Sequence, residues 1–327
     1  VHEYNHKKIL CTIREKVYLA DINCEKFEKI AEINDLKIAS ILSAVRPAER
    51  LLRFHVRNLL ELKRDNSILA IALGRVYRII DHKVELLTKL RRGLGPLKDG
   101  LCEDEDGNIY LGEYFLNPWR EPVFLFKSVD GGKTWRVIKT FYRIRHIHFV
   151  QYDPYEKAIW IGTGDRDEES MIMFSRNGGK SWITIGHGSQ AFRAVSVIFT
   201  SEYVYWGSDS PLIHNYIYRY NRSTGNVERL ISVEGPVYYS TILEDGTMLF
   251  ATAVEKCRYP TDYCVHLWAT KDARRWCKLG VFRKDRWPFI FGHGRIIFAR
   301  GQLESKVFFF AEALKDIDGS TVYAEVL

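Results

Sequence analysis

Two histidines separated by one residue are the first feature of this 327-residue sequence that could do chemistry. On a β-strand, His146 and His148 would point to the same face, because side chains alternate along a strand. Two imidazoles on one face can bind one metal ion, or act as a base and the group that orients it. His293 is a further candidate ligand, so a divalent metal ion is a candidate cofactor.

Arginines and a glutamine accompany the histidine pair. Arg145 directly precedes it, and Gln190 and Arg193 lie in a segment that holds the matching position one repeat unit later. A guanidinium group binds a carboxylate through two parallel hydrogen bonds. We therefore predict that these three residues bind a substrate carboxylate, of the kind that uronic and sialic sugars carry.

Four acidic residues follow four β-rich runs at matching positions: Glu113, Asp165, Asp209 and Glu255. If those runs are equivalent strands, the carboxylates converge, repel one another and raise some of their pKa values. Such a group suits the acid–base pair of a glycosidase or a cation site. The competing interpretation is that aspartate and glutamate commonly form turns at strand ends.

Aromatic residues complete the candidate site. Tyr238 and Tyr239 open a later predicted strand, where Tyr239 could act as a nucleophile or base and Tyr238 could contact substrate. Trp119 is a candidate for stacking on a sugar ring, although packing in the core is the more common role of tryptophan.

A repeat along the chain predicts how these residues are positioned. The segment Ser128–Trp135 recurs as Ser175–Trp182, 47 positions later, and a worn copy ends at Trp276. Each unit reads as four short strands, which is typical of a propeller blade. The chain length accommodates about seven such units. We therefore predict an all-β fold, a seven-bladed β-propeller of four-stranded antiparallel blades, as a single domain over residues 1–327.

The N-terminal units are less regular. The first shows three clear strands, at 8–13, 16–22 and 27–33, and the second, 53–90, lacks the repeated turn. The stretch Leu36–Leu52 could form a short helix, because its apolar positions fit either period. Six blades with an N-terminal appendage are therefore the alternative architecture.

The repeated turn resembles the Asp-box, or bacterial neuraminidase repeat, of sialidase-like propellers. The matching residues are Ser128, Asp130, Gly132, Thr134 and Trp135, and in the second copy Ser175, Asn177, Gly179, Ser181 and Trp182. The resemblance implies a hairpin between the third and fourth strands of a blade, with a structural role for these residues. It also implies that they lie opposite the usual active-site face. The Arg-Ile-Pro motif of sialidases is absent, so sialidase activity is not expected.

The histidine, glutamine and arginine grouping is similar to that of propeller-shaped polysaccharide lyases. In those enzymes a metal ion or arginine neutralises a uronate carboxylate, and a histidine or tyrosine removes the adjacent proton. We therefore expect a glycoside hydrolase or polysaccharide lyase that acts on an acidic oligo- or polysaccharide at the mouth of the central channel. The alternative is a non-catalytic propeller that binds a glycan or a protein, because no complete catalytic motif occurs.

Composition bears on the binding partners and the location of the protein. The net charge of +7 is spread along the chain, and no nucleic-acid-binding module is visible, so nucleic acid is not an expected partner. No apolar run is long enough for a membrane-spanning helix, and no N-terminal stretch reads as a signal peptide. Both a secreted and a cytoplasmic location stay open.

Two further features concern stability. Cys257 and Cys264 bracket a short loop that a disulfide could restrain, Cys11 and Cys24 could also pair, and six free thiols are the alternative. The sequence contains only three glutamines among many lysines, arginines and glutamates, which is a pattern found in proteins of thermophiles.

Overall fold

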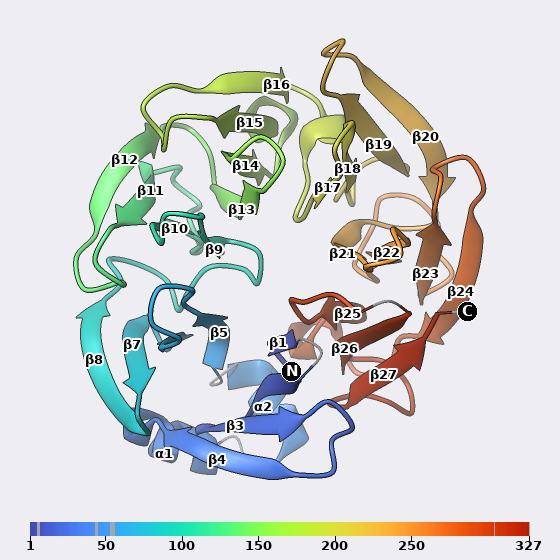
Figure 1. Cartoon of the computed structure of the whole chain (residues 1–327). Coiled ribbons are helices and arrows are strands. Elements are labelled where there is room, and N and C mark those ends of the chain that lie inside the picture. Colours follow the sequence, from blue (N-terminus) through green and yellow to red (C-terminus); the bar gives the residue numbers. More distant parts are fainter. Residues whose placement is uncertain (5–6, 43–44, 53–55, 304, 327) are drawn as a thin grey trace.

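Seven small β-sheets arranged in a ring form the molecule (Figure 1). The computed structural model describes residues 1–4, 7–42, 45–52, 56–303 and 305–326. Within every sheet, neighbouring strands are consecutive in the chain and antiparallel. This is the predicted seven-bladed propeller, and the six-bladed alternative is wrong, because the irregular first unit is itself a blade.

The strands of the first four blades have the following bounds. Blade 1 contains β1 (Glu3–Tyr4), β2 (Lys8–Ile13), β3 (Lys16–Asp21) and β4 (Phe27–Glu32), and blade 2 contains β5 (Val56–Glu61), β6 (Ile68–Ala72), β7 (Arg75–Ile80) and β8 (Lys83–Lys89). Blade 3 contains β9 (Leu101–Glu103), β10 (Ile109–Gly112), β11 (Val123–Ser128) and β12 (Arg136–Phe141). Blade 4 contains β13 (His146–Asp153), β14 (Ala158–Gly164), β15 (Met171–Ser175) and β16 (Ile183–His187).

The remaining blades complete the ring. Blade 5 contains β17 (Ile198–Phe199), β18 (Tyr203–Gly207), β19 (Asn215–Asn221) and β20 (Val227–Val233), and blade 6 contains β21 (Val237–Ile242), β22 (Met248–Thr252), β23 (Cys264–Thr270) and β24 (Cys277–Arg283). Blade 7 has three strands among the described residues: β25 (Arg295–Phe298), β26 (Lys306–Glu312) and β27 (Thr321–Glu325).

Helices are few and short. The two α-helices are α1 (Lys37–Leu42) and α2 (Arg46–Leu52), and the 3-10 turns are η1 (Asn34–Leu36), η2 (Asp167–Glu169), η3 (Gln190–Phe192) and η4 (Phe289–Phe291). Both α-helices lie in the connection from blade 1 to blade 2, where the sequence allowed a helix. Among the described residues, no helix has the length and apolar character needed to cross a bilayer.

The ring closes where its two ends meet. Glu3 in β1 forms a parallel bridge with Arg300, just after β25, so backbone contacts join blade 1 to blade 7. The Arg300 guanidinium group also donates to the backbone oxygen of Leu59 at 3.1 Å and to that of Leu101 at 2.9 Å. One side chain of blade 7 thus reaches the innermost strands of blades 2 and 3.

The inner strand of blade 5 has only two residues. Only Ile198 and Phe199 pair as β17. Immediately before them, the Gln151 side chain takes the place of a neighbouring strand: it accepts from the Val197 backbone N–H at 2.9 Å and donates to the Val197 oxygen at 3.0 Å. The backbone upstream is therefore free to form η3 and to position Arg193.

The repeated turn is a hairpin between the third and fourth strands of blades 3 and 4. The Asp130 carboxylate accepts from the backbone N–H of Thr134 at 2.9 Å and from its hydroxyl at 2.6 Å. Gly132 has a positive φ of 88°, which glycine adopts without strain. In blade 4, Asn177 Oδ1 accepts from the Ser181 backbone N–H at 2.9 Å, and Asn177 Nδ2 donates to the Ser181 hydroxyl at 2.8 Å. These bonds stabilise the two turns.

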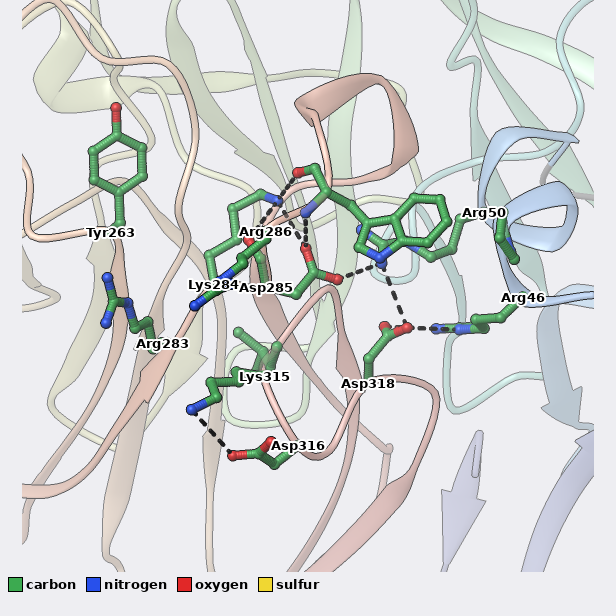
Figure 2. Close-up of a pocket in the computed structure, with 13 residues that line it drawn as sticks. Arg46, Arg50, Tyr263, Arg283, Lys284, Asp285, Arg286, Lys315, Asp316 and Asp318 are labelled. Carbon is green, nitrogen blue, oxygen red and sulfur yellow. Dashed lines mark hydrogen bonds and ion pairs between the residues drawn. The ribbon is translucent and has the colours of Figure 1, made fainter.

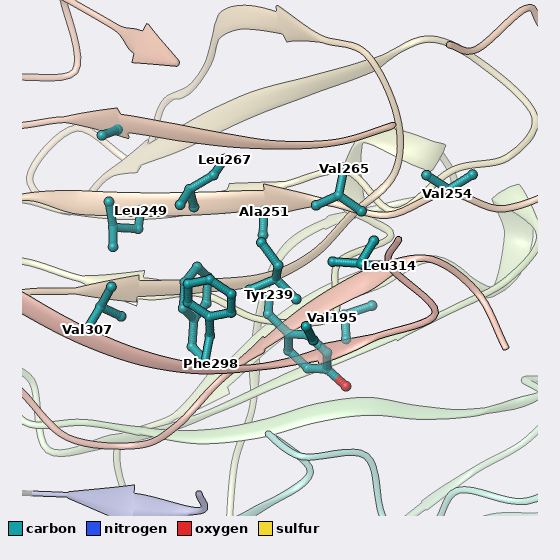
Figure 3. Close-up of a cluster of buried hydrophobic side chains, with 14 of the residues drawn as sticks. Val195, Tyr239, Leu249, Ala251, Val254, Val265, Leu267, Phe298, Val307 and Leu314 are labelled. Carbon is teal, nitrogen blue, oxygen red and sulfur yellow. The ribbon is translucent and has the colours of Figure 1, made fainter. Parts of the chain in front are cut away.

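Neighbouring blades pack face to face through apolar side chains. Between blades 6 and 7, the buried cluster contains Leu249 and Ala251 from β22, together with Phe298 from β25 (Figure 3). Within blade 4, the Phe149 ring of β13 lies directly against Gly162 of β14, where a Cβ atom would be 2.1 Å from the ring. All six cysteines are free thiols in this structure.

Candidate active site

Blade connections place the candidate residues on one face of the propeller. The connections from the second to the third strand of a blade, and from one blade to the next, emerge at the same end of the strands. Asp165, Asp209 and Glu255 follow β14, β18 and β22, and His146 begins β13. We call this side the mouth face. The turns with Asp130 and Asn177 lie at the other end of the strands.

His146, His148 and Asp165 converge on one point. The two Nε2 atoms lie 3.1 Å apart, and the Asp165 Oδ1 atom lies 3.2 Å from His148 Nε2 and 3.5 Å from His146 Nε2. Both histidines are buried, at 5% and 2% exposure. The paired strands β13 and β14 bring these side chains together, with a β-bulge in β13 between Ile147 and Phe149.

The far nitrogens of both rings face backbone oxygens. His148 Nδ1 lies 3.2 Å from the oxygen of Ala194, and His146 Nδ1 lies 3.4 Å from that of Phe115. When a metal ion is bound, a proton on each Nδ1 would satisfy these oxygens and leave both Nε2 atoms available as ligands. Metal-binding histidines are commonly oriented by such outer contacts.

The spacing of the three atoms fits a metal ion. Nitrogen and oxygen ligands lie about 2.0–2.2 Å from zinc-like ions, so neighbouring ligands are about 2.8–3.6 Å apart at ordinary angles. The three observed distances fall within that range. Two histidines and one carboxylate form a set that leaves other coordination positions open. This group could therefore hold a divalent ion together with a ligand molecule.

Two arginines surround Asp165. Arg145 donates from Nη1 to Oδ2 at 2.8 Å, and Arg193 donates from Nη1 to the backbone oxygen of Asp165 at 3.0 Å. Arg193 Nε also donates to Asp209 Oδ2 at 3.2 Å, so it joins blade 4 to blade 5. The Arg145 side chain is 36% exposed, whereas that of Arg193 is 11% exposed. Arg145 is therefore the more accessible of the two to a ligand.

Electrostatics separate the acidic residues into two kinds. Burial alone would raise the pKa of Asp165, but its hydrogen bonds with the two histidines and the charge of Arg193 hold that pKa well below its usual range. Burial raises the pKa of Asp209 and of Glu255, and the negative charge of Asp165 adds to the rise in both, against the lowering effect of Arg193. Asp165 is therefore held ionised, whereas the neighbouring Asp209 and Glu255 have raised pKa values.

Burial also governs the basicity of the histidine pair. Desolvation lowers the pKa of His148 to about 4, although Asp165 acts in the opposite direction. At neutral pH the His148 ring is therefore uncharged, which is the form that binds metal ions.

Gln190 and two residues that the sequence analysis missed support the Asp165 loop. Gln190 Nε2 donates to the Asp165 backbone oxygen at 3.1 Å. The carboxylate of Glu169 accepts from the Asp165 N–H at 3.1 Å and from Arg120 Nε at 2.6 Å. No motif marks Glu169 or Arg120. The run of acidic residues after β14 was the only signal, and it is indistinguishable from an ordinary solvent-exposed turn.

Tyr114 is the third residue that the analysis missed. Its ring centroid lies 4.1 Å from that of His146, with the rings tilted by 32°. Burial raises the pKa of Tyr114, with the charge of Asp165 adding to the effect. Tyr114 immediately follows Glu113, so the residue beside the predicted one contacts the histidines.

Glu113 itself is engaged elsewhere. Its two carboxylate oxygens each accept from Arg91 at 2.8 Å, and one also accepts from the Phe124 backbone N–H at 2.8 Å. These bonds hold the connection between β10 and β11. The structure therefore does not bring Glu113 to the histidines.

The predicted aromatic and third histidine residues lie apart from the histidine pair. Tyr239 is 3% exposed within the cluster of Figure 3, whereas Tyr238 hydrogen-bonds with Glu255 and lies 6.5 Å from His293 between ring centroids. His293 is not part of the converging set among the described residues. Trp119 is 87% exposed on the β10–β11 connection of the mouth face.

Comparisons with known proteins identify the fold and go no further. The chain is similar to an oligogalacturonate lyase in complex with manganese, with 12% identity, a TM-score of 0.60, and coverage of 95% of this chain and 82% of the other. It is also similar to an ancestral GH74 enzyme, with 12% identity, a TM-score of 0.62, and coverage of 99% of this chain but 44% of the other. A putative TolB from Agrobacterium tumefaciens gives 13% identity, a TM-score of 0.52, and coverage of 84% and 91%.

Sequence-based comparisons add nothing to these structural likenesses. No family model matches the chain, and no curated protein matches it. At identities of 10–13%, the structural neighbours establish a β-propeller, and a fold does not define an activity.

Proposed function

We propose that this propeller is a carbohydrate-active enzyme that acts on an acidic, uronic-acid-type glycan at the mouth face, with a divalent metal ion held by His146, His148 and Asp165. The observation that carries the proposal is the convergence of these three ligand atoms beside Arg145. A uronate carboxylate is the natural ligand for a metal ion with open positions next to an accessible arginine.

Between the two predicted chemistries, β-elimination is favoured. A bound divalent ion would neutralise the uronate carboxylate and make the hydrogen on the adjacent carbon more acidic. Arg145, whose guanidinium group is partly exposed, would orient the same carboxylate. A base of this chain then takes that proton, the electron pair forms a carbon–carbon double bond, and the glycosidic oxygen leaves with the departing sugar.

Asp209 and Glu255 are the candidates for the base and the acid. Each has a buried carboxylate oxygen without a hydrogen-bond partner among the described residues, namely Oδ1 of Asp209 and Oε1 of Glu255. Their raised pKa values bring them closer to neutrality, where proton transfer in both directions is efficient. Tyr238, which hydrogen-bonds with Glu255, would orient it. The same two carboxyl groups could serve a hydrolase.

Two of the structural neighbours support this proposal, since one is an oligogalacturonate lyase in complex with manganese and the other is an ancestral GH74 enzyme. The hydrogen-bonded turns of blades 3 and 4 support the further proposal that they are Asp-boxes.

Incubation with uronic-acid oligosaccharides tests the function. Elimination produces both new reducing ends and ultraviolet absorbance from the unsaturated product, whereas hydrolysis produces reducing ends alone. The variant His148→Ala should lose turnover, and His187→Ala, an exposed histidine on β16 of the same blade, should retain it. Absence of both products with tight glycan binding would favour the non-catalytic alternative, and absence of binding would contradict the proposal.

A further inference from the structure

A cavity lies over blades 6 and 7, lined by residues that the proposed reaction does not use (Figure 2). Its volume is about 620 Å³, which is the size of a small-molecule site. Four parts of the chain form its walls: α2, the end of β24 with the segment that follows, Tyr263 before β23, and the turn between β26 and β27. All four belong to connections on the mouth face.

The inner wall of this cavity is electrically balanced. Arg50 forms ion pairs with Asp285 and Asp318, and Arg46 Nη2 lies 2.8 Å from Asp318. Lys284 pairs with Asp285 at 3.1 Å. These contacts attach α2 to blade 7 and leave the inner cations with partners.

The outer wall carries unbalanced positive charge. Within the described part of the chain, no hydrogen bond or ion pair engages the side chain of Arg283 or Arg286. Lys315 has only Asp316, 3.9 Å away, and both of those side chains are exposed. Figure 2 shows the charged ends of Arg283, Arg286 and Lys315 on the same side of the cavity as Tyr263. Three cations in one concave site favour an anionic ligand.

Aromatic rings flank these cations. Trp287 is 43% exposed and Tyr263 is 56% exposed. The Trp287 ring is held by an edge contact with Phe291, at 5.0 Å between centroids, and by Arg50, whose guanidinium carbon lies 5.9 Å from the ring centroid. A fixed, half-exposed indole beside free guanidinium groups suits a ligand with both a ring face and negative charge.

Two stretches of chain lead from this cavity to the proposed active site. The connection from β22 to β23 runs from Glu255 to Tyr263, eight residues later. The segment between β24 and β25 runs from Arg286 in the cavity to His293, which contacts Tyr238. Since an extended chain spans at most about 3.6 Å per residue, Glu255 and Tyr263 are separated by no more than about 29 Å. A short oligosaccharide can bridge such a distance.

We infer that this cavity is a distal subsite, in which Arg283, Arg286 and Lys315 bind a carboxylate of the acidic oligosaccharide whose reacting unit lies at His146, His148 and Asp165. The inference rests on the proposed function and adds to it a preference for long over short anionic chains.

Calorimetric titration with galacturonate oligomers of two and six units tests the inference. The double variant Arg283→Ala/Arg286→Ala should weaken binding of the hexamer by about 100-fold or more, as expected for the loss of two charge-assisted hydrogen bonds, and change dimer binding by less than about twofold. The matched control is Arg274→Ala/Arg275→Ala, which removes the same charge from the opposite end of blade 6 and should leave both affinities unchanged.

The possible outcomes separate the two proposals. The distal subsite would be overturned if the wild type and the Arg283/Arg286 double variant bound the hexamer equally, or if the double variant lost as much affinity for the dimer as for the hexamer. In either case, dimer binding that depends on His148 would still support the proposed function. A wild-type protein that binds neither oligomer would overturn both. A neutral glucose hexamer that binds as tightly as the galacturonate hexamer would also overturn the distal subsite.

Discussion

A metal ion bound at His146, His148 and Asp165 should stabilise the folded protein measurably. A ligand present at 100 times its Kd stabilises the native state by about 2.7 kcal/mol. The unfolding entropy of a 327-residue chain is about 0.7 kcal/mol per kelvin, at roughly 2.1 cal/mol per kelvin for each residue. Manganese added to metal-stripped protein at that concentration should therefore raise Tm by about 4 °C.

Removal of one ligand should abolish most of this shift. If His148→Ala weakens binding by about 100-fold, the same manganese concentration equals the new Kd and stabilises by only about 0.4 kcal/mol, or less than about 1 °C in Tm. The control His187→Ala removes an exposed histidine from the same blade and should keep the full shift. Scanning calorimetry after treatment with a chelator measures all three proteins under one protocol.

Two results would refute this reasoning. One is a Tm that does not change with manganese or with any other first-row divalent ion. The other is a shift of equal size in His148→Ala and in the wild type, which would place the bound ion elsewhere.

Three other predictions follow from the same contacts. In metal-free protein, NMR titration should show His148 uncharged down to pH near 4. Because the unfolded state binds more protons than the native state between about pH 6.5 and 4, His148 lowers stability as pH falls through that range, and a pKa near the ordinary value would contradict the burial of its ring. Gly164→Ala should weaken manganese binding at least about tenfold without removing a ligand, because the new Cβ would lie 2.7 Å from His148 Cε1 and displace the ring. A calorimetric titration measures the affinity, and an unchanged Kd would contradict the idea that the His148 ring must keep its position. Asp130→Ala should lower the free energy of unfolding in urea by about 1–2 kcal/mol, because the bonds to Thr134 are lost. It should leave the manganese-induced rise in Tm unchanged, and loss of that rise would contradict the placement of the turn and the metal site at opposite ends of the strands.

The repeat made the architecture predictable, because each blade is built from local antiparallel pairings. The three strands predicted in the first unit agree with β2 to β4 to within one residue at each end. The short β17 was not predictable, because it depends on Gln151, a side chain from the neighbouring blade that bonds to the Val197 backbone. The sequence does not show that a side chain of one blade bonds to the backbone where the strand of the next blade would pair.

The candidate site was predictable where strand geometry alone positions a side chain. Asp165 lies close to His146 because it directly follows β14, which pairs with β13, whereas the position of His148 also depends on a β-bulge between Ile147 and Phe149 that alternation does not predict. Glu113 has the equivalent position in blade 3, yet Arg91 engages it through a long-range ion pair that no spacing indicates. The cavity over blades 6 and 7 could not be predicted from the sequence for the same reason, because its cations come from connections that are far apart in the chain.

The bonds from Arg300 to Leu59 and Leu101 bear on how the ring is held closed. Arg300 joins blade 7 to blade 1 through its backbone and to blades 2 and 3 through its side chain. One residue therefore fastens both sides of the seam, so a force that pulls the two ends of the ring apart would be shared by four blades rather than by one pair of strands.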